Sequence, residues 1–234
     1  MNTEPPAVRY PDLDILSQQL AAGIAADLAA AIEARGMASL VVSGGRSPVK
    51  LFERLRTLAI DWGRVCVALA DERWVDPSDP ASNERLVRDV LLRDAAAAAR
   101  FTGLKNGCAT ADLGADMAWS TFNGVPRPFD ALVLGMGDDG HTASLFPDSP
   151  NLERALDEAA AAGCVGMRSP IAPEARLSLN LAALLDSRRI VILITGESKW
   201  RTYIAALQPG AAERMPVRAV LRQQHAPVEV IWSP

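Results

Sequence analysis

Cysteine is scarce in this chain. Its three cysteines, Cys66, Cys108 and Cys164, stand far apart among 234 residues. An odd, widely spaced set gives neither a disulfide framework nor the close pairs of a structural zinc site. We therefore expect free thiols that pack as small apolar residues, in a protein of the reducing cytoplasm.

An excess of positive charge is also missing, and so is a long apolar run. The 24 Lys and Arg against 28 Asp and Glu give a net charge of −4, so no basic stripe for nucleic-acid phosphates and no nucleic-acid partner are expected. No uninterrupted apolar run approaches the roughly 20 residues that cross a bilayer, so no membrane association is expected. Residues 1–12 contain prolines and acidic residues but no basic or apolar leader segment, and we expect no signal peptide.

The composition that remains is that of a globular α/β protein. A hydrophobic fraction of 49% and a charged fraction of 22% are ordinary for a chain with a sizeable core. The length fits one large domain or two small ones. Helical and extended patterns alternate along the chain without a detectable repeat, which favours a parallel sheet covered by helices.

The first helix shows the clearest periodicity. Apolar residues recur every fourth position from Leu16 to Ile32, and Gly36 follows as a stop signal, which predicts a helix over 12–35. Further helices are expected from Pro48 onwards and over 83–93 (capped by Asn83 and extended by the alanines of 95–99), 112–122, 151–162, 181–185, 196–207 and 216–221. Strands are expected over 39–43, 65–70, 101–103, 131–134, 164–167, 177–181, 190–195 and 228–233, with Pro170 and Pro173 in a loop.

The segment from Asp130 to Pro147 carries the strongest functional signal. A short apolar run ends at Gly135, and the glycines that follow allow a sharp turn and a close approach to a ligand. Asp139 and His141 lie in this turn, and His141 is one of only two histidines. A histidine at the carboxyl end of a parallel strand lies where open α/β sheets bind ligands, and imidazole exchanges a proton near neutral pH. The alternative is a surface turn in which the histidine caps a helix.

A second glycine loop follows the expected strand 39–43. Gly44, Gly45, Arg46 and Ser47 precede Pro48, which suits the first position of a helix. Free backbone N–H groups and the helix dipole in such a loop can bind a phosphate. The loop matches neither the Walker A pattern nor the dinucleotide fingerprint, so an ordinary turn is an equal alternative.

Charged residues follow two further strands. Asp71 and Arg73 come directly after strand 65–70, Lys199 follows strand 190–195 at the start of a helix, and Arg176 stands at the head of strand 177–181. Each could be merely solvated. Together with the glycine loop, these cations would form a phosphate site beside a histidine that transfers a proton. The nucleophile motif G-x-S-x-G and a metal-ligand pattern are both missing, so neither a serine hydrolase nor a zinc hydrolase is indicated.

These segments resemble the 6-phosphogluconolactonase family, in the family's order and through most of the chain. The matching stretches are Ser43–Pro48, Asp71–Arg73 with Ser82–Asn83, Leu134–Pro147, Arg176–Leu179 and Thr195–Lys199. The resemblance implies a single domain over 1–234 with a three-layer α/β/α fold and a Rossmann-like, mostly parallel sheet. It also implies hydrolysis of 6-phospho-D-glucono-1,5-lactone in the oxidative pentose phosphate pathway, without a metal or organic cofactor. We expect a cytoplasmic monomer or weak homodimer.

The resemblance also suggests roles for the individual residues. His141, held by Asp139, would be the general base, while Arg73, oriented by Asp71, would contact the substrate and stabilise an oxyanion. Gly44, Gly45, Arg46, Ser47, Arg176 and Lys199 would hold the phosphate. One departure is that the family's loop often reads Gly-Gly-Ser-Thr-Pro, whereas Arg46 and Ser47 occupy the variable positions here, which leaves the role of Arg46 open.

Two alternatives share the fold. Glucosamine-6-phosphate deaminases carry a glutamate that supports their histidine, and Phe146 occupies that position here. A non-catalytic sugar-phosphate sensor usually comes fused to a DNA-binding unit, and no basic segment indicates one. His225, the other histidine, is expected to be an unremarkable surface residue.

Overall fold

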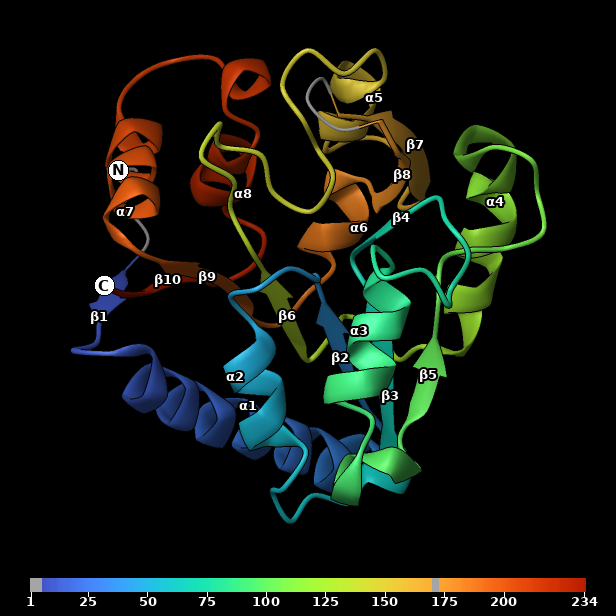
Figure 1. Ribbon diagram of the computed structural model, residues 1–234, viewed down its shortest axis with the longest axis vertical. Coiled ribbons are helices and arrows are strands. Elements are labelled where there is room, and N and C mark those ends of the chain that lie inside the picture. Colours follow the sequence, from blue (N-terminus) through green and yellow to red (C-terminus); the bar gives the residue numbers. More distant parts are fainter. Residues whose placement is uncertain (1–5, 170–172) are drawn as a thin grey trace.

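The computed structural model describes residues 6–169 and 173–234 and is built on a seven-stranded sheet whose neighbours all run parallel. From one edge to the other the strands are β1 (Ala7–Arg9), β10 (Val228–Ser233), β9 (Ile190–Thr195), β6 (Ala131–Leu134), β2 (Ala38–Val42), β3 (Val65–Leu69) and β5 (Arg100–Thr102) (Figure 1). The order places β6 and β2 side by side, so the two glycine loops that follow them meet at one edge of the sheet. The expected Pro170 loop lies partly outside the described residues.

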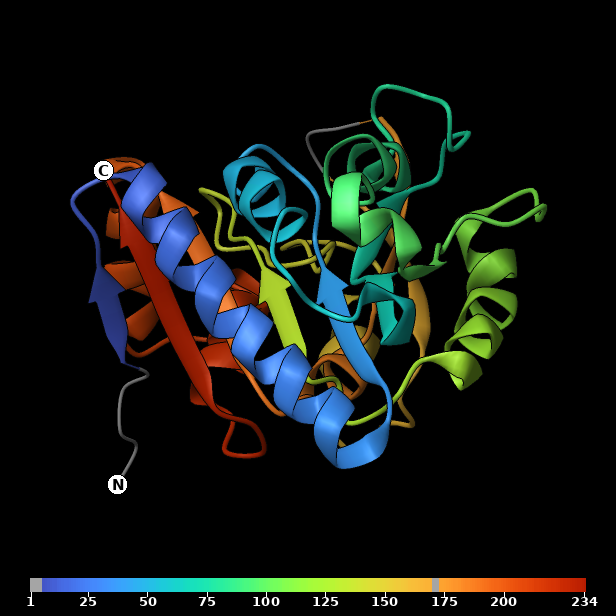
Figure 2. The same ribbon diagram turned by 90° about the horizontal axis from the view of Figure 1, so that it is seen from below.

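Helices cover both faces of this sheet, as expected for a three-layer fold. Figure 2 shows α1 (Leu13–Arg35) running diagonally across one face, while α7 (Glu197–Leu207) and α8 (Val217–Arg222) lie beyond the strands. The other helices are α2 (Val49–Leu55), α3 (Asn83–Val90), α4 (Ala111–Thr121), α5 (Leu152–Leu156) and α6 (Leu181–Leu185), with short 3₁₀ turns at Trp62–Arg64, Asp94–Ala98, Phe122–Gly124 and Ala212–Arg214.

Helix α1 begins and ends at the signals that the sequence provides. The Asp12 side chain accepts a hydrogen bond from the Ile15 N–H, and Gly36 ends the helix at a φ of 80°. By length and composition α1 could cross a membrane. Its stripe of Leu16, Leu20 and Ile24 is buried in the core, and a core helix meets the same test as a membrane span.

Several expected elements are wrong in detail. The strand expected over 177–181 covers Ala175–Leu179, so Arg176 lies within it rather than at its head. Residues 71–73, for which no strand was expected, form strand β4 (Asp71–Arg73) in a small antiparallel sheet with β8 (Ala175–Leu179) and β7 (Cys164–Arg168). The helix expected over 151–162 ends at Leu156, because Asp157 is extended. Helix α3 is capped by Ser82, whose side chain accepts from the Arg85 N–H, rather than by Asn83. Of the alanines over 95–99, the first four belong to a separate 3₁₀ turn (Asp94–Ala98) and Ala99 is extended.

Two further features differ from the expectation: an additional strand near the N-terminus and the partial exposure of Cys108. Strand β1 adds an edge to the sheet, and Arg9 from it lies over the rings of Trp200 and Trp232, at 4.7 and 4.9 Å from their centroids. The cysteines are free, and Cys66 and Cys164 are buried as expected, whereas Cys108 is only half-buried. Burial raises the pKa of the Cys164 thiol to about 12, so this thiol stays protonated and inert.

Candidate active site

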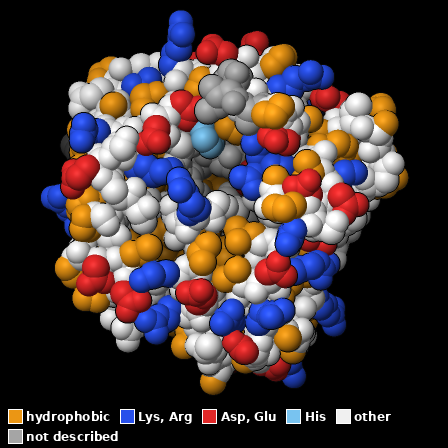
Figure 3. All heavy atoms as spheres, viewed as in Figure 1, with side chains coloured by type: hydrophobic (Ala, Val, Ile, Leu, Met, Phe, Trp, Pro, Cys, Tyr) orange, Lys and Arg blue, Asp and Glu red, His pale blue; other side chains and the backbone are white. Residues whose placement is uncertain are grey.

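A cleft of about 270 Å³ opens where the strands β2, β3, β6 and β9 end at their carboxyl edge. It brings together most of the residues singled out from the sequence. The cleft is lined by Ser43, Gly44, Gly45, Arg46, Ser47, Pro48, Asp71, Arg73, Asn83, Gly135, Met136, Gly137, His141, Ala143, Ser144, Phe146, Ser169, Arg176 and Lys199. On this face a histidine lies in a hollow with Lys and Arg side chains on either side (Figure 3).

His141 is held by Asp139 at the wall of the cleft. The Asp139 Oδ1 atom lies 2.6 Å from His141 Nδ1 and also accepts from the His141 backbone N–H at 3.0 Å. Because Nδ1 is engaged by the carboxylate, Nε2 is the ring nitrogen that remains for a proton transfer in the cleft. Asp139 does not itself line the cleft, so its part is to orient the ring.

The glycines of this turn make room for the imidazole. A Cβ on Gly137 would lie 2.1 Å from His141 Nδ1 and 2.5 Å from Asp139 Oδ1. Gly140 has a φ of 80°, a conformation that L side chains rarely adopt. The turn is closed by hydrogen bonds from Gly137 N to the His141 carbonyl and from Gly140 N to the Gly137 carbonyl. The backbone therefore fixes the ring before any ligand arrives.

The electrostatics of the pair favour a permanent carboxylate. Burial raises the pKa of Asp139, but the hydrogen bonds and the charge of His141 outweigh it, so this pKa lies below its ordinary value. Asp139 is therefore ionised at neutral pH and can stabilise the imidazolium that forms when His141 takes a proton.

Phe146 packs against the ring of His141. The two ring centroids lie 4.4 Å apart at an interplanar angle of 44°. A phenyl ring packs against the imidazole without accepting its proton, so the only carboxylate bonded to the ring is Asp139 among the contacts of the described residues. The position at which the resemblance implies a glutamate in deaminases is thus occupied here by an apolar side chain in contact with the histidine.

The second glycine loop lies beside this histidine. Gly45 has a φ of 96°, and Ser47 Oγ lies 3.3 Å from Thr195 Oγ1 at the end of β9. Helix α2 behind the loop has only seven residues, so its dipole adds little to anion binding. Backbone N–H groups and the Ser47 hydroxyl are the donors that this loop offers.

Lys199 extends into the cleft from the first turn of α7. Its Nζ donates a hydrogen bond to the Met136 carbonyl oxygen, next to the histidine turn. An ammonium with three donors can keep this bond and still contact an anion. The structure therefore brings Lys199 to the site, as the sequence suggested.

Arg73 and Arg176 come from the small antiparallel sheet. Arg73 Nη1 donates to the Ala81 carbonyl oxygen at 2.6 Å. Arg176 is buried, and its burial, followed by the charge of Arg73, lowers the pKa of its guanidinium from the ordinary value. Two neighbouring guanidiniums repel each other, and an anion placed between them would relieve this repulsion.

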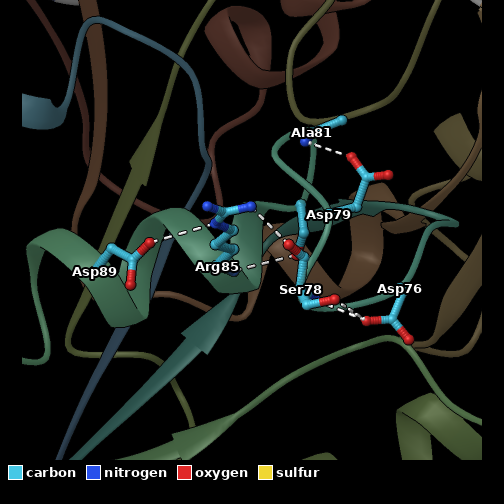
Figure 4. A network of polar contacts seen from close by, with 7 residues as sticks. Asp76, Ser78, Asp79, Ala81, Arg85 and Asp89 are labelled. Carbon is cyan, nitrogen blue, oxygen red and sulfur yellow. Dashed lines mark hydrogen bonds and ion pairs between the residues drawn. The ribbon is translucent and has the colours of Figure 1, made fainter.

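The loop that holds Arg73 is itself fixed. The Ala81 N–H donates to Asp79 Oδ1 at 2.7 Å, and the Ser78 N–H and hydroxyl both donate to Asp76 Oδ1. Arg85 then donates to the Ser78 carbonyl oxygen, as Figure 4 shows. The Ala81 carbonyl is thereby a rigid acceptor that orients Arg73.

Arg46 is exposed at the mouth of the cleft. It also lines an adjoining cavity of about 410 Å³ together with Arg73, Arg176 and Glu174. At this position Arg46 can attract an anion to the mouth of the cleft. Its guanidinium does not lie among the buried donors.

The expected pairing of Asp71 with Arg73 is wrong. Asp71 Oδ2 accepts a hydrogen bond from Ser144 Oγ at 2.7 Å, while Arg73 is held by Ala81. Because residues 71 and 73 lie on the same face of β4, both still face the cleft. Asp71 therefore belongs to the site, but it does not orient Arg73.

Three residues in or beside the site lie in the stretches that resemble the family but were given no individual role in the site from the sequence. Ser144 binds Asp71, and Asn83 Nδ2 donates to the Asp71 carbonyl oxygen at 2.8 Å. Glu72 is fully buried and accepts from the N–H groups of Arg73, Asn83 and Glu84 and from the Ser82 hydroxyl. Burial raises the pKa of Glu72, and these hydrogen bonds partly offset the rise. Glu72 does not line the cleft; its sequence signals are its place in the matching Asp71–Arg73 stretch and its position after a buried strand.

The described residues contain no cluster of three or more His, Cys, Asp or Glu that could hold a metal ion. His225, the other histidine, is exposed and is not among the residues that line the cleft. Its Nε2 lies 3.2 Å from Glu158 Oε2, a surface contact that the sequence did not suggest.

Comparison with known proteins gives one consistent result. The profile of the family described as glucosamine-6-phosphate isomerases/6-phosphogluconolactonase matches residues 11–232. A 6-phosphogluconolactonase of Pseudomonas aeruginosa is 48% identical over 92% of this chain and 89% of its own, and one of Pseudomonas putida is 45% identical over 95% and 90%. The crystal structure of a 6-phosphogluconolactonase from Shewanella baltica superimposes with a TM-score of 0.96 at 49% identity and covers both chains fully.

Proposed function

Because the chain belongs to the glucosamine-6-phosphate isomerase/6-phosphogluconolactonase family, we propose that it hydrolyses 6-phospho-D-glucono-1,5-lactone to 6-phospho-D-gluconate. This reaction is the second step of the oxidative pentose phosphate pathway. The observation that carries the proposal is the Asp139–His141 pair beside a cation-lined cleft of substrate size. We expect the enzyme to act in the cytoplasm as a monomer or weak homodimer, without a metal or organic cofactor.

His141 is the general base. Its Nε2 removes a proton from a water molecule as the water oxygen attacks the lactone carbonyl carbon, and Asp139 stabilises the imidazolium that results. The same nitrogen then returns the proton to the ring oxygen as the bond between that oxygen and the carbonyl carbon breaks. The absence of a side chain at Gly137 leaves room for the ring in this position.

The phosphate is bound by groups from three separate segments. The Gly44–Ser47 loop offers N–H groups and a hydroxyl, Lys199 offers its ammonium, and Arg176 offers a buried guanidinium. Clamping the phosphorylated tail fixes the carbonyl at the other end of the molecule near His141, which converts binding energy into orientation. Arg46 at the mouth of the cleft contributes attraction over a longer distance.

Arg73 stabilises the oxyanion of the tetrahedral intermediate. The Ala81 carbonyl and its fixed loop hold the guanidinium in place, so little reorganisation is needed when the negative charge develops. The deaminase alternative is disfavoured because Phe146, not a carboxylate, packs against the histidine.

The direct test is lactone hydrolysis. The loss of 6-phosphogluconolactone is followed with and without the protein, at a pH where spontaneous hydrolysis is slow. Catalysis predicts acceleration that scales with protein concentration. Saturable binding without acceleration would instead indicate a sugar-phosphate sensor on the same fold.

A further inference from the structure

The cleft contains buried polar atoms that have no hydrogen-bond partner among the residues that the structure describes. Among the described residues, Ser43 Oγ, Asp71 Oδ1, Asn83 Oδ1 and Arg176 Nε are buried, lack a hydrogen-bond partner and belong to residues that line the cleft. A buried polar group without a partner destabilises a fold, so four in one cleft call for a ligand that completes them.

Two of these atoms can only accept a hydrogen bond. Asp71 Oδ1 belongs to a carboxylate, and Asn83 Oδ1 is the oxygen of an amide whose nitrogen already donates to the Asp71 carbonyl. A phosphate dianion offers acceptors alone and would repel Asp71. The partner of Asp71 must therefore donate a proton.

The surroundings of Asp71 also limit the charge of that donor. The side chains of Arg73 and Arg176 line the same cleft, and the pKa of Arg176 responds to the charges of both Arg73 and Asp71. An ammonium group placed here would meet two guanidiniums. A neutral hydroxyl is the donor that fits both the acceptor and its cationic neighbours.

Ser144 fixes the orientation of the Asp71 carboxylate. Ser144 Oγ donates to Asp71 Oδ2 at 2.7 Å, and the Ser144 N–H donates to Ser178 Oγ at 3.3 Å, so Oδ1 is the oxygen left for a ligand. Both Asp71 and Ser144 are almost fully buried, at 6% and 1% exposure. Their geometry is set by β4, β8 and the histidine turn together.

We infer that Asp71 Oδ1 accepts a hydrogen bond from one hydroxyl of the sugar ring, with Ser144 as the positioning residue, and that this contact makes the site specific for a hydroxylated lactone. The inference rests on the proposed function and adds to it a specificity-determining contact. Asn83 Oδ1, which lies so close to Gly44 that a Cβ there would be 1.9 Å away, is a second acceptor for the same ring.

The test compares the parent lactone with analogues that each lack one ring hydroxyl, using kcat/KM as the readout. The wild type is expected to reject one analogue by about 10- to 100-fold, because a charged acceptor then stays unpaired. Asp71→Ala should lose a similar factor on the parent lactone and nothing further on that analogue. Asp71→Asn, which keeps an acceptor oxygen, should fall between the two.

Ser144→Ala leaves the carboxylate in place and should reduce the discrimination between parent and analogue, because it lowers kcat/KM more on the parent than on the analogue. Ser187→Ala, at another buried serine whose hydroxyl bonds to a backbone carbonyl, is the matched control and should behave as the wild type. Equal treatment of all analogues by the wild type overturns the inference, as does an equal loss on every lactone in Asp71→Ala. In both outcomes the wild type still hydrolyses the parent lactone. A wild type that does not hydrolyse the parent lactone overturns the proposed function itself.

Discussion

Arg73 and Arg176 stand directly opposite each other on the antiparallel strands β4 and β8. Like charges in this position destabilise a sheet, and the charge of Arg73 helps burial to lower the pKa of Arg176. Arg176 Nε also lacks a partner among the described contacts. The charges of Asp71, Glu174 and Glu72 offset part of this repulsion in the free protein, and an anionic substrate bound between the two guanidiniums would offset it further.

Replacing one member of the pair separates binding from stability. Arg176→Met keeps an apolar stem of similar length, so it should raise KM about tenfold or more while leaving the melting temperature of the free protein unchanged or higher. The product 6-phosphogluconate should then stabilise the variant less than the wild type. Steady-state kinetics and thermal unfolding with and without product measure both effects, and a large loss of free-protein stability with an unchanged KM would refute this view of the pair.

Lys199 should act on binding more than on chemistry. Lys199→Ala should raise KM, because an ammonium that contacts the phosphate is lost, while kcat falls only a few-fold. Lys50→Ala is the control, since Lys50 forms an exposed ion pair with Asp14. An unchanged KM in Lys199→Ala would remove Lys199 from the phosphate site.

Gly137 should be needed for the position of the histidine. Gly137→Ala is tolerated by the backbone, whose φ is not in the left-handed region, but its Cβ would collide with His141 and Asp139. Displacing the base by such a contact should lower kcat by about 10²-fold with little change in KM. Gly124→Ala, where nothing lies within 4 Å of the added Cβ, should retain full activity.

Asp139 should contribute to stability in a pH-dependent way. Its pKa in the folded state lies below the ordinary value, so its contribution is present above about pH 4 and is lost as the pH falls through the lowered pKa. The gap in unfolding free energy between the wild type and Asp139→Asn should therefore shrink in acid. Urea unfolding over a pH series measures it, with the exposed Asp116→Asn as control; a gap that is constant with pH would contradict the ion-pair account.

The parallel sheet and much of the site were predictable because they depend on local patterns. The strands β6, β9 and β10 have the expected bounds, since an apolar run between turn residues specifies a buried strand. The turn holding His141 was predictable from its glycines. These signals need no knowledge of what lies across the fold.

The features that were missed depend on contacts between distant segments. Residues 71–73 form a strand only because β8, about a hundred residues later, supplies hydrogen-bond partners. The partner of Asp71 is Ser144 rather than its neighbour Arg73, and nothing local distinguishes the two. The prediction of a helix over 151–162 is wrong beyond Leu156, because the alanines there favour a helix but supply no buried stripe.

The most direct measurement is lactone turnover by a variant that lacks the base. His141→Ala should lower kcat by about 10² to 10⁴ and leave KM within a few-fold, because the phosphate clamp is intact. His225→Ala, at the exposed second histidine, should match the wild type. Near-wild-type turnover by His141→Ala would contradict the assignment of His141 as the general base.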